Sequence, residues 1–254
     1  MRMALFAREL GRGSETIALL HGFGGSHAAW THIQERLADD VATLAYDLPG
    51  HGASLSYPEG GSAKVAAQAL LADFATRGLE RVHLVGHSMG GAVAALMGIM
   101  EPDRVASLTL LSPGGFGSEI NHRLLTRYAA AHDEAALRGC MEAMYGWMSP
   151  VSDAAIADTL AARAAPGAVE KLVAIAAGLV RDGRQGLLPQ DRLEALDMPV
   201  SVVWGGLDNV LPARQAQGLP WQFAVHLFPD LGHMLPGEAP DEMLAIIQRT
   251  ARNG

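Results

Sequence analysis

Three side chains that lie far apart in the sequence have the types needed for nucleophilic catalysis. Ser88 is the middle residue of Gly86-His87-Ser88-Met89-Gly90, Asp208 lies within "VVWGGLDNVLP", and His233 lies within "LFPDLGHMLPGEAP". A serine alcohol is a weak nucleophile, so it needs a base to take its proton and an acid to orient that base. Such a set could attack an acyl carbonyl and form a covalent acyl-enzyme.

The residues around Ser88 predict an abrupt turn from a strand to a helix. Arg81–Val85 has the composition of a buried strand, and 90–100 that of a helix rich in small residues. So tight a turn forces its central residue to a positive φ and lifts the serine hydroxyl toward the helix N-terminus. Side chains in place of Gly86 and Gly90 would collide there. The pattern G-x-S-x-G in this context is a nucleophile elbow.

The order along the chain selects the partners of Ser88. Of ten histidines, His233 directly follows the last predicted strand, and Asp208 follows the strand before it. The rival position, at the end of the strand 105–113, carries Ser112 and Pro113 and no carboxylate. Asp230 lies too close to His233 in sequence to reach its ring easily. Six other histidines are less suited to be the base. Structural roles are expected for His21, His51 and His83, and the side chain of His87 should point away from Ser88. His122 and His132 lie in the inserted segment, where they could contact the substrate.

An acyl-transfer site also needs donors for the oxyanion. The glycine-rich segment "HGFGG" follows the predicted strand 16–22. We expect the backbone N–H of Phe23, together with that of Met89 just after the nucleophile, to form the oxyanion hole.

Strands and helices alternate along the chain, which favours an α/β fold with a mostly parallel central sheet and helices on both faces. The predicted strands are 4–10, 16–22, 41–52, 81–85, 105–113, 198–206 and 224–232, and the first two are expected to pair antiparallel. Helices are expected at 27–38, 62–77, 90–101 and 239–251. The first and last parts, 1–116 and 197–254, thus form the core.

The segment 117–196 breaks the alternation. Its helical stretches are 121–132, 135–147, 153–165 and 168–181, and no convincing strand occurs between them. An all-helical insertion between two strands is expected to cover the carboxyl edge of the sheet, where ligands bind in open α/β folds. It is therefore predicted to be a lid.

The lid carries an apolar stripe at helical spacing within "CMEAMYGWM", composed of Met141, Met144, Tyr145 and Met148 with Trp147 beside it. Most stripes of this kind pack in a core. Methionine also adapts to ligands, so Met144, Tyr145, Trp147 and Met148 are candidates for lining an apolar acyl pocket. Both interpretations hold if the packed face borders the cleft.

Composition excludes several functions. The chain has 254 residues, 49% hydrophobic, and a formal net charge of −8, which disfavours nucleic acid and anionic membranes. No apolar run approaches the ~20 residues of a membrane span, and "MRMALFAREL" does not read as a signal peptide. The lone Cys140 cannot form an internal disulfide, which fits the reducing cytoplasm, where we place the protein. No metal site or cofactor is expected, and the oligomeric state is left open.

The motifs together resemble the α/β-hydrolase superfamily over essentially the whole chain. The matching segments are "LLHGFGGSHAAW", "LAYDLPGHGAS", "HLVGHSMGGAVA", "PDRVASLTLLSP", "VVWGGLDNVLP" and "GHMLPGEAP". "LPGHGAS" and "LLSPGGFGSEIN" are similar to the hydrolase-like domain of acetoin dehydrogenase dihydrolipoyl acetyltransferase subunits. This sequence contains neither a lipoyl-lysine segment nor the H-x-x-x-D-G site of ordinary 2-oxo acid dehydrogenase acyltransferases.

The resemblance implies a Ser88–Asp208–His233 triad that cleaves a small or medium ester or thioester. Acyl transfer to a thiol or alcohol, carbon–carbon bond hydrolysis and a haloperoxidase side activity use the same triad. Carbon–carbon bond hydrolases also bind a carboxylate through an arginine, for which Arg123, Arg127 and Arg138 are present. Haloalkane dehalogenases and epoxide hydrolases place aspartate at the elbow, so Ser88 disfavours them. A ligand receptor without turnover would not need an aligned base.

Overall fold

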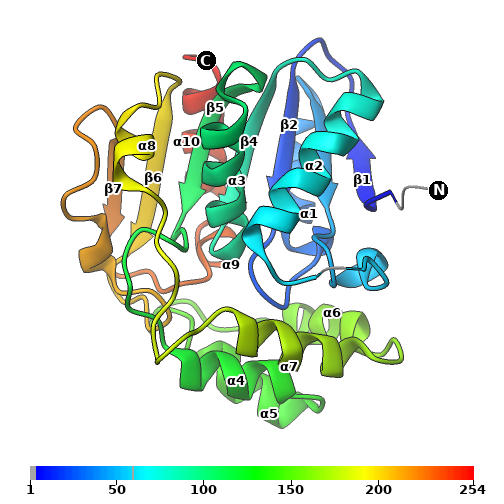
Figure 1. Cartoon of the computed structure of the whole chain (residues 1–254). Coiled ribbons are helices and arrows are strands. Elements are labelled where there is room, and N and C mark those ends of the chain that lie inside the picture. The colour runs from blue at the N-terminus through cyan, green and yellow to red at the C-terminus, as the bar shows by residue number, and fades with distance from the viewer. Residues whose placement is uncertain (1–3, 59) are drawn as a thin grey trace.

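The computed structural model describes residues 4–58 and 60–254, and its centre is a seven-stranded sheet (Figure 1). The strand order is β1-β3-β2-β4-β5-β6-β7, and only the β1–β3 pair is antiparallel. The strands are β1 Ala7–Leu10, β2 Thr16–Leu20, β3 Ala42–Tyr46, β4 Val82–His87, β5 Val105–Leu111, β6 Val200–Gly205 and β7 Ala224–Phe228. The predicted α/β-hydrolase fold is thereby confirmed.

The predicted antiparallel pairing of the first two strands is wrong. β1 pairs with β3, with Ala7 opposite Tyr46, while β2 lies between β3 and β4 and runs parallel to both. The reason is burial: every residue of β2 is buried, as in a strand covered on both faces, whereas β1 is partly exposed. β2 therefore takes a central position and β1 an edge.

Helices cover both faces of the sheet. Ile17 and Leu19 of β2 belong to one hydrophobic core, and Ala18 and Leu20 to the other, because successive side chains point to opposite faces. The first core includes residues of α1 Thr31–Leu37 and α10 Pro240–Ala251. The second includes residues of α2 Ala63–Arg77 and α3 Met89–Met100, which lie in front of the sheet in Figure 1.

Four helices of the inserted segment form a separate layer below the sheet in Figure 1. They are α4 His122–Ala130, α5 Glu134–Glu142, α6 Asp153–Arg163 and α7 Ala168–Gly178. Three of them begin with a side chain that accepts a hydrogen bond from the first turn, as N-caps do: Asn121, Asp133 and Ser152. The exact limits predicted for the lid, 117 and 196, stay a prediction.

The remaining elements are short. They are α8 Gln190–Glu194, which contacts α3, α9 Leu235–Glu238, and the 3-10 helices His27–Trp30, Gly52–Ser54, Pro102–Arg104 and Ala213–Ala216. Within the described residues, no helix is long and apolar enough to cross a membrane.

Candidate active site

Ser88 occupies the strained turn that its flanking residues predict. It links β4 directly to α3 with φ +53° and ψ −114°, a conformation that a residue with a side chain adopts only when its surroundings impose it. A Cβ atom on Gly86 would collide with the carbonyl group of Gly90, and one on Gly90 with the carbonyl group of Leu20. Both glycines are therefore required for the close packing of β2, β4 and α3.

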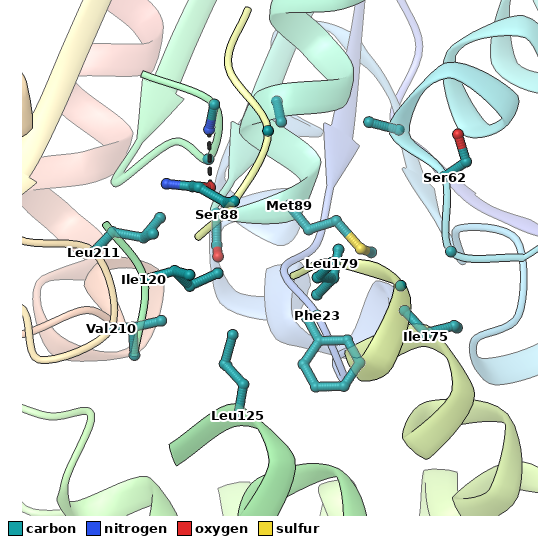
Figure 2. Close-up of a pocket in the computed structure, with 18 of the residues that line it drawn as sticks. Phe23, Ser62, Ser88, Met89, Ile120, Leu125, Ile175, Leu179, Val210 and Leu211 are labelled. Carbon is teal, nitrogen blue, oxygen red and sulfur yellow. Dashed lines mark hydrogen bonds between the residues drawn. The ribbon is translucent and has the colours of Figure 1, made fainter. Parts of the chain in front are cut away.

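The Ser88 hydroxyl points into a cavity of about 520 Å³ below the sheet (Figure 2). The cavity walls come from the start of α2, the start of α3, α4, α7 and the loops after β5 and β6. Among the described residues that line it, none carries a charge; the labelled members are Phe23, Ser62, Ser88, Met89, Ile120, Leu125, Ile175, Leu179, Val210 and Leu211. The cavity thus suits an uncharged apolar group next to the serine.

His233 and Asp208 form a buried pair. Nδ1 of His233 lies 2.7 Å from Oδ2 of Asp208, and both side chains are almost fully buried. Oδ1 of Asp208 accepts hydrogen bonds from the N–H groups of Val210, at 2.8 Å, and Leu211, at 2.7 Å. Burial alone would raise the pKa of Asp208, but the electrostatic interaction with His233, the hydrogen bond from its ring and the two backbone N–H groups outweigh burial and lower that pKa.

An ionised Asp208 can only accept hydrogen bonds, so Nδ1 of His233 must carry a hydrogen, and in the neutral ring the lone pair is then on Nε2. That tautomer is the one a general base needs. Ser88 and His233 both line a smaller cavity of about 50 Å³. The hydrogen bonds of the described residues do not include one between Ser88 Oγ and His233 Nε2, so that link stays a prediction.

Three neighbours hold the His233 loop: Met144, His87 and Glu238, of which Glu238 belongs to no motif that pointed to the site. The His233 N–H donates to the carbonyl of Met144 at 2.7 Å, and Nε2 of His87 donates to the carbonyl of His233 at 2.8 Å. The carboxylate of Glu238 accepts from three backbone N–H groups, those of Gly146, Gly232 and Met234. Glu238 thereby ties the lid segment 144–146 to the loop that carries His233.

The residues of the two predicted oxyanion donors, Phe23 and Met89, line the same cavity as Ser88 (Figure 2). Met89 is the first residue of α3, so its N–H has no partner within the helix. Phe23 lies in the turn after β2, and none of the hydrogen bonds found among the described residues is donated by its N–H. The turn is held by His51, whose Nε2 accepts the Gly24 N–H at 3.1 Å, and by His21, whose Nε2 accepts the Leu48 N–H at 3.0 Å.

His21, His51 and His87 make the stability of this region sensitive to acid. Burial, the largest cause, lowers the pKa of His21 to about 4 and those of His51 and His87 to about 3. The unfolded chain binds protons at these histidines below pH ~6.5, while the folded chain does not, so the free energy of unfolding falls as pH drops below 6.5.

By pH 5 each of the three histidines removes ~2 kcal/mol, and together they remove roughly 6 kcal/mol, comparable with the whole stability of a typical domain. Urea unfolding between pH 7.5 and 4.5 should show this steep loss. His87→Gln keeps a donor toward the His233 carbonyl. It should lower by about one the number of protons taken up on unfolding, which is read from the slope of the free energy of unfolding against pH. A flat profile down to pH 5 would contradict the neutral burial of these rings.

The structure does not bring all the predicted lid residues to the pocket. Met144 is buried and lines the smaller cavity, while Tyr145 is buried without lining either cavity. Trp147 and Met148 are 88% and 84% exposed, so a pocket-lining role does not fit them. The helix predicted to reach residue 147 ends at Glu142, and the helical spacing assumed for these residues is therefore absent.

The three arginines that were candidates for binding a substrate carboxylate do not line the cavity at Ser88. Arg123 and Arg127 line a separate surface pocket with Asn121 and Asn209, and Arg138 pairs with Glu134 and Asp153. The lid histidines, His122 and His132, line neither cavity beside Ser88. In residues 4–58 and 60–254, no group of three His, Cys, Asp or Glu side chains is arranged to hold a metal ion.

Comparisons with known proteins identify the family of the chain. Residues 17–246 match the model of the alpha/beta hydrolase family. A dihydrolipoyllysine-residue acetyltransferase component of the acetoin cleaving system from Cupriavidus necator is 36% identical over 251 residues, which are 96% of this chain and 65% of that protein. The chain thus spans 65% of the length of this relative, and the predicted resemblance to it is confirmed.

Two further proteins are similar over nearly their whole length. A pimeloyl-[acyl-carrier protein] methyl ester esterase from Chromobacterium violaceum is 29% identical, with 91% of each chain covered. The crystal structure of a meta-cleavage product hydrolase from Pseudomonas fluorescens superposes with a TM-score of 0.87 at 18% identity, covering 98% of this chain and 94% of that one, and this likeness shows the fold. The elbow, the seven-stranded sheet and the family match over 17–246 place this chain in the α/β-hydrolase family.

Proposed function

We propose that the protein is a serine hydrolase that cleaves carboxylic esters with an uncharged, medium-length acyl group. The observation that carries the proposal is the Ser88 hydroxyl, which points into an uncharged apolar cavity beside the buried His233–Asp208 pair. A serine, a histidine with a free Nε2 and an ionised aspartate supply the nucleophile, the base and its orienting acid.

In this proposal Ser88 attacks the acyl carbonyl while His233 takes its proton. Asp208 stabilises the imidazolium that forms. The N–H groups of Phe23 and Met89 stabilise the oxyanion, because preorganised donors act strongly in a site from which water is excluded. Water, activated by His233, then releases the acid from the acyl-enzyme.

The cavity indicates the kind of acyl group. Its volume of about 520 Å³ lies within the roughly 300–1,000 Å³ of ordinary ligand pockets, and its walls are mainly aliphatic. A free carboxylate at the far end of the acyl chain would be buried without a cation, which is unfavourable. We therefore favour neutral acyl chains over dicarboxylic ones.

Carbon–carbon bond hydrolysis is a second candidate, supported by the likeness in fold to the meta-cleavage product hydrolase. Enzymes of that type bind a substrate carboxylate through an arginine. None of the described residues lining the cavity is an arginine, so ester cleavage fits the site better.

Acyl transfer is a third candidate because of the similarity to the acetyltransferase component. Measuring how the acyl group is divided between water and an added thiol separates transfer from hydrolysis. A receptor without turnover would give no product in either assay.

Chain-length selectivity tests the assignment of the cavity. Leu179→Ala removes an apolar side chain that faces the cavity in Figure 2. It should lower kcat/KM for methyl octanoate relative to methyl acetate at least about tenfold. The reason is that each methylene contact in an apolar pocket is worth ~1–3 kcal/mol. Trp147→Ala, an exposed lid residue, is the control and should leave the ratio unchanged. An equal loss on both esters in Leu179→Ala would mean that Leu179 serves only lid packing.

A further inference from the structure

Two cavities of very different size meet at Ser88. Phe23, Ser88 and Leu125 line both of them, so the serine lies at their boundary. The large cavity has a volume of about 520 Å³ and the small one about 50 Å³. An ester bound at Ser88 has two arms, the acyl chain and the alkoxy group, and the two cavities offer them very unequal room.

The position of His233 assigns each arm to a cavity. His233 must give its proton to the alkoxy oxygen when the ester bond breaks, so this oxygen has to lie within hydrogen-bond reach of the imidazole. His233 lines the small cavity and is absent from the walls of the large one. The alkoxy group therefore belongs in the small cavity, which leaves the large one to the acyl chain.

The small cavity holds only a small group. With about 50 Å³ against about 520 Å³, it offers roughly a tenth of the room of the large cavity, so it suits water or an alkoxy group of one or two carbons far better than a long chain. Its remaining walls are small residues after β2, larger residues of the core and two residues of the lid, namely Gly22, Gly25, Ala29, His87, Met234, Tyr128 and Met144.

The walls of the small cavity are fixed by contacts of their own. The ring of Tyr128 is held by Arg163, whose guanidinium carbon lies 4.4 Å from the ring centroid and whose Nη1 donates to the Tyr128 carbonyl at 2.5 Å. Cε1 of that ring lies against Gly24, where an added Cβ would be 2.5 Å from it. The backbone of Met144 is held by the N–H of His233. The cavity thus has little freedom to widen.

We infer that the site is directional: it takes esters that combine a medium or long neutral acyl chain with a methyl or ethyl alkoxy group. This inference rests on the function proposed above. Ser88 Oγ bonds to the acyl carbon, the bond from that carbon to the alkoxy oxygen breaks, and the alkoxide leaves as methanol or ethanol with the proton from His233. Water then enters the same cavity, gives a proton to His233 and bonds to the acyl carbon. The bond from that carbon to Ser88 Oγ breaks, Oγ takes the proton back from His233, and the carboxylic acid leaves. A bulky thiol has no room there, so hydrolysis prevails over transfer to such a thiol.

Two isomeric esters test the direction. Methyl octanoate and heptyl acetate have the same atoms and similar hydrophobicity, and differ in the side of the carbonyl on which the long chain lies. We expect kcat/KM to be at least about 100-fold higher for methyl octanoate, because each misplaced methylene loses ~1–3 kcal/mol. Equal rates, or a preference for heptyl acetate, would overturn the directional site and leave the proposed esterase function standing. Cleavage of neither isomer would contradict the esterase function, and with it this inference.

A pair of methionine variants locates the selectivity. Met144→Ala opens the small cavity and should shift the ratio of the two kcat/KM values toward heptyl acetate at least about tenfold. Met141→Ala is the matched control: Met141 is equally buried in the lid but lines neither cavity, so its loss of packing should not move the ratio. The same ratio in Met144→Ala, Met141→Ala and wild type would overturn the assignment of the small cavity.

Discussion

Ser88→Ala is expected to fold normally and to lose about 10⁶-fold in kcat on methyl octanoate, the loss typical of removing a triad nucleophile. The hydroxyl is the only group removed, and none of the described hydrogen bonds uses it. The backbone stays at the same positive φ because packing of Gly86 and Gly90 imposes that conformation. Circular dichroism and urea unfolding check the fold, and a pH-stat assay measures turnover.

A second serine offers a matched control. Ser112, which directly follows β5, is fully buried and, like Ser88, has a positive φ, of +40°. Ser112→Ala should therefore place alanine under similar backbone strain, yet keep activity within tenfold of wild type. If Ser88→Ala also stayed within tenfold, Ser88 would not be the nucleophile.

Asp208→Asn is expected to lower turnover about 10⁴-fold with little change of structure. The N–H groups of Val210 and Leu211 hold one oxygen of this side chain, so the new amide keeps its oxygen there and turns its NH₂ toward His233. Nδ1 of His233 must then accept, which places the hydrogen on Nε2. In that tautomer Nε2 has no lone pair for the proton of Ser88.

The control for this change is Asp230→Asn. Asp230 is exposed and lies three residues before His233, so its amide should retain nearly full activity. If Asp230→Asn were the damaging change and Asp208→Asn were not, the third member of the triad would be wrongly assigned. A pH-rate profile adds a second readout, since the wrong tautomer lowers turnover at every pH at which the wild type is active.

The residues close to Ser88 in sequence were sufficient to predict the nucleophile elbow. Gly86, Ser88 and Gly90 are constrained by atoms within a few residues or on the adjacent strand, so their spacing alone predicts the observed positive φ of Ser88. The pair of Asp208 and His233 was also predicted, because the carboxyl ends of parallel strands meet at one edge of the sheet and the order of strands brings the two loops together.

Features that depend on distant contacts were not predictable in the same way. The antiparallel partner of β1 depends on which strands become buried on both faces, and adjacency in sequence suggested the wrong one. Trp147 and Met148 were assigned to a helix face, but the chain leaves the helix at Glu142, and the Gly146 N–H is then held by Glu238, 92 residues away. Ile175 and Leu179 reach the cavity only because α7 folds back across the sheet edge.

The most direct test of the account is covalent labelling with an alkyl β-lactone. The ring opens when a nucleophile attacks its carbonyl, and no leaving group departs, so the acyl-enzyme accumulates and can be mapped by mass spectrometry. We predict one adduct per chain, on Ser88, with loss of ester hydrolysis in proportion to labelling and no adduct in Ser88→Ala. An inactivating adduct on any other residue, or full activity in a chain fully labelled at Ser88, would contradict the assignment of Ser88 as the nucleophile.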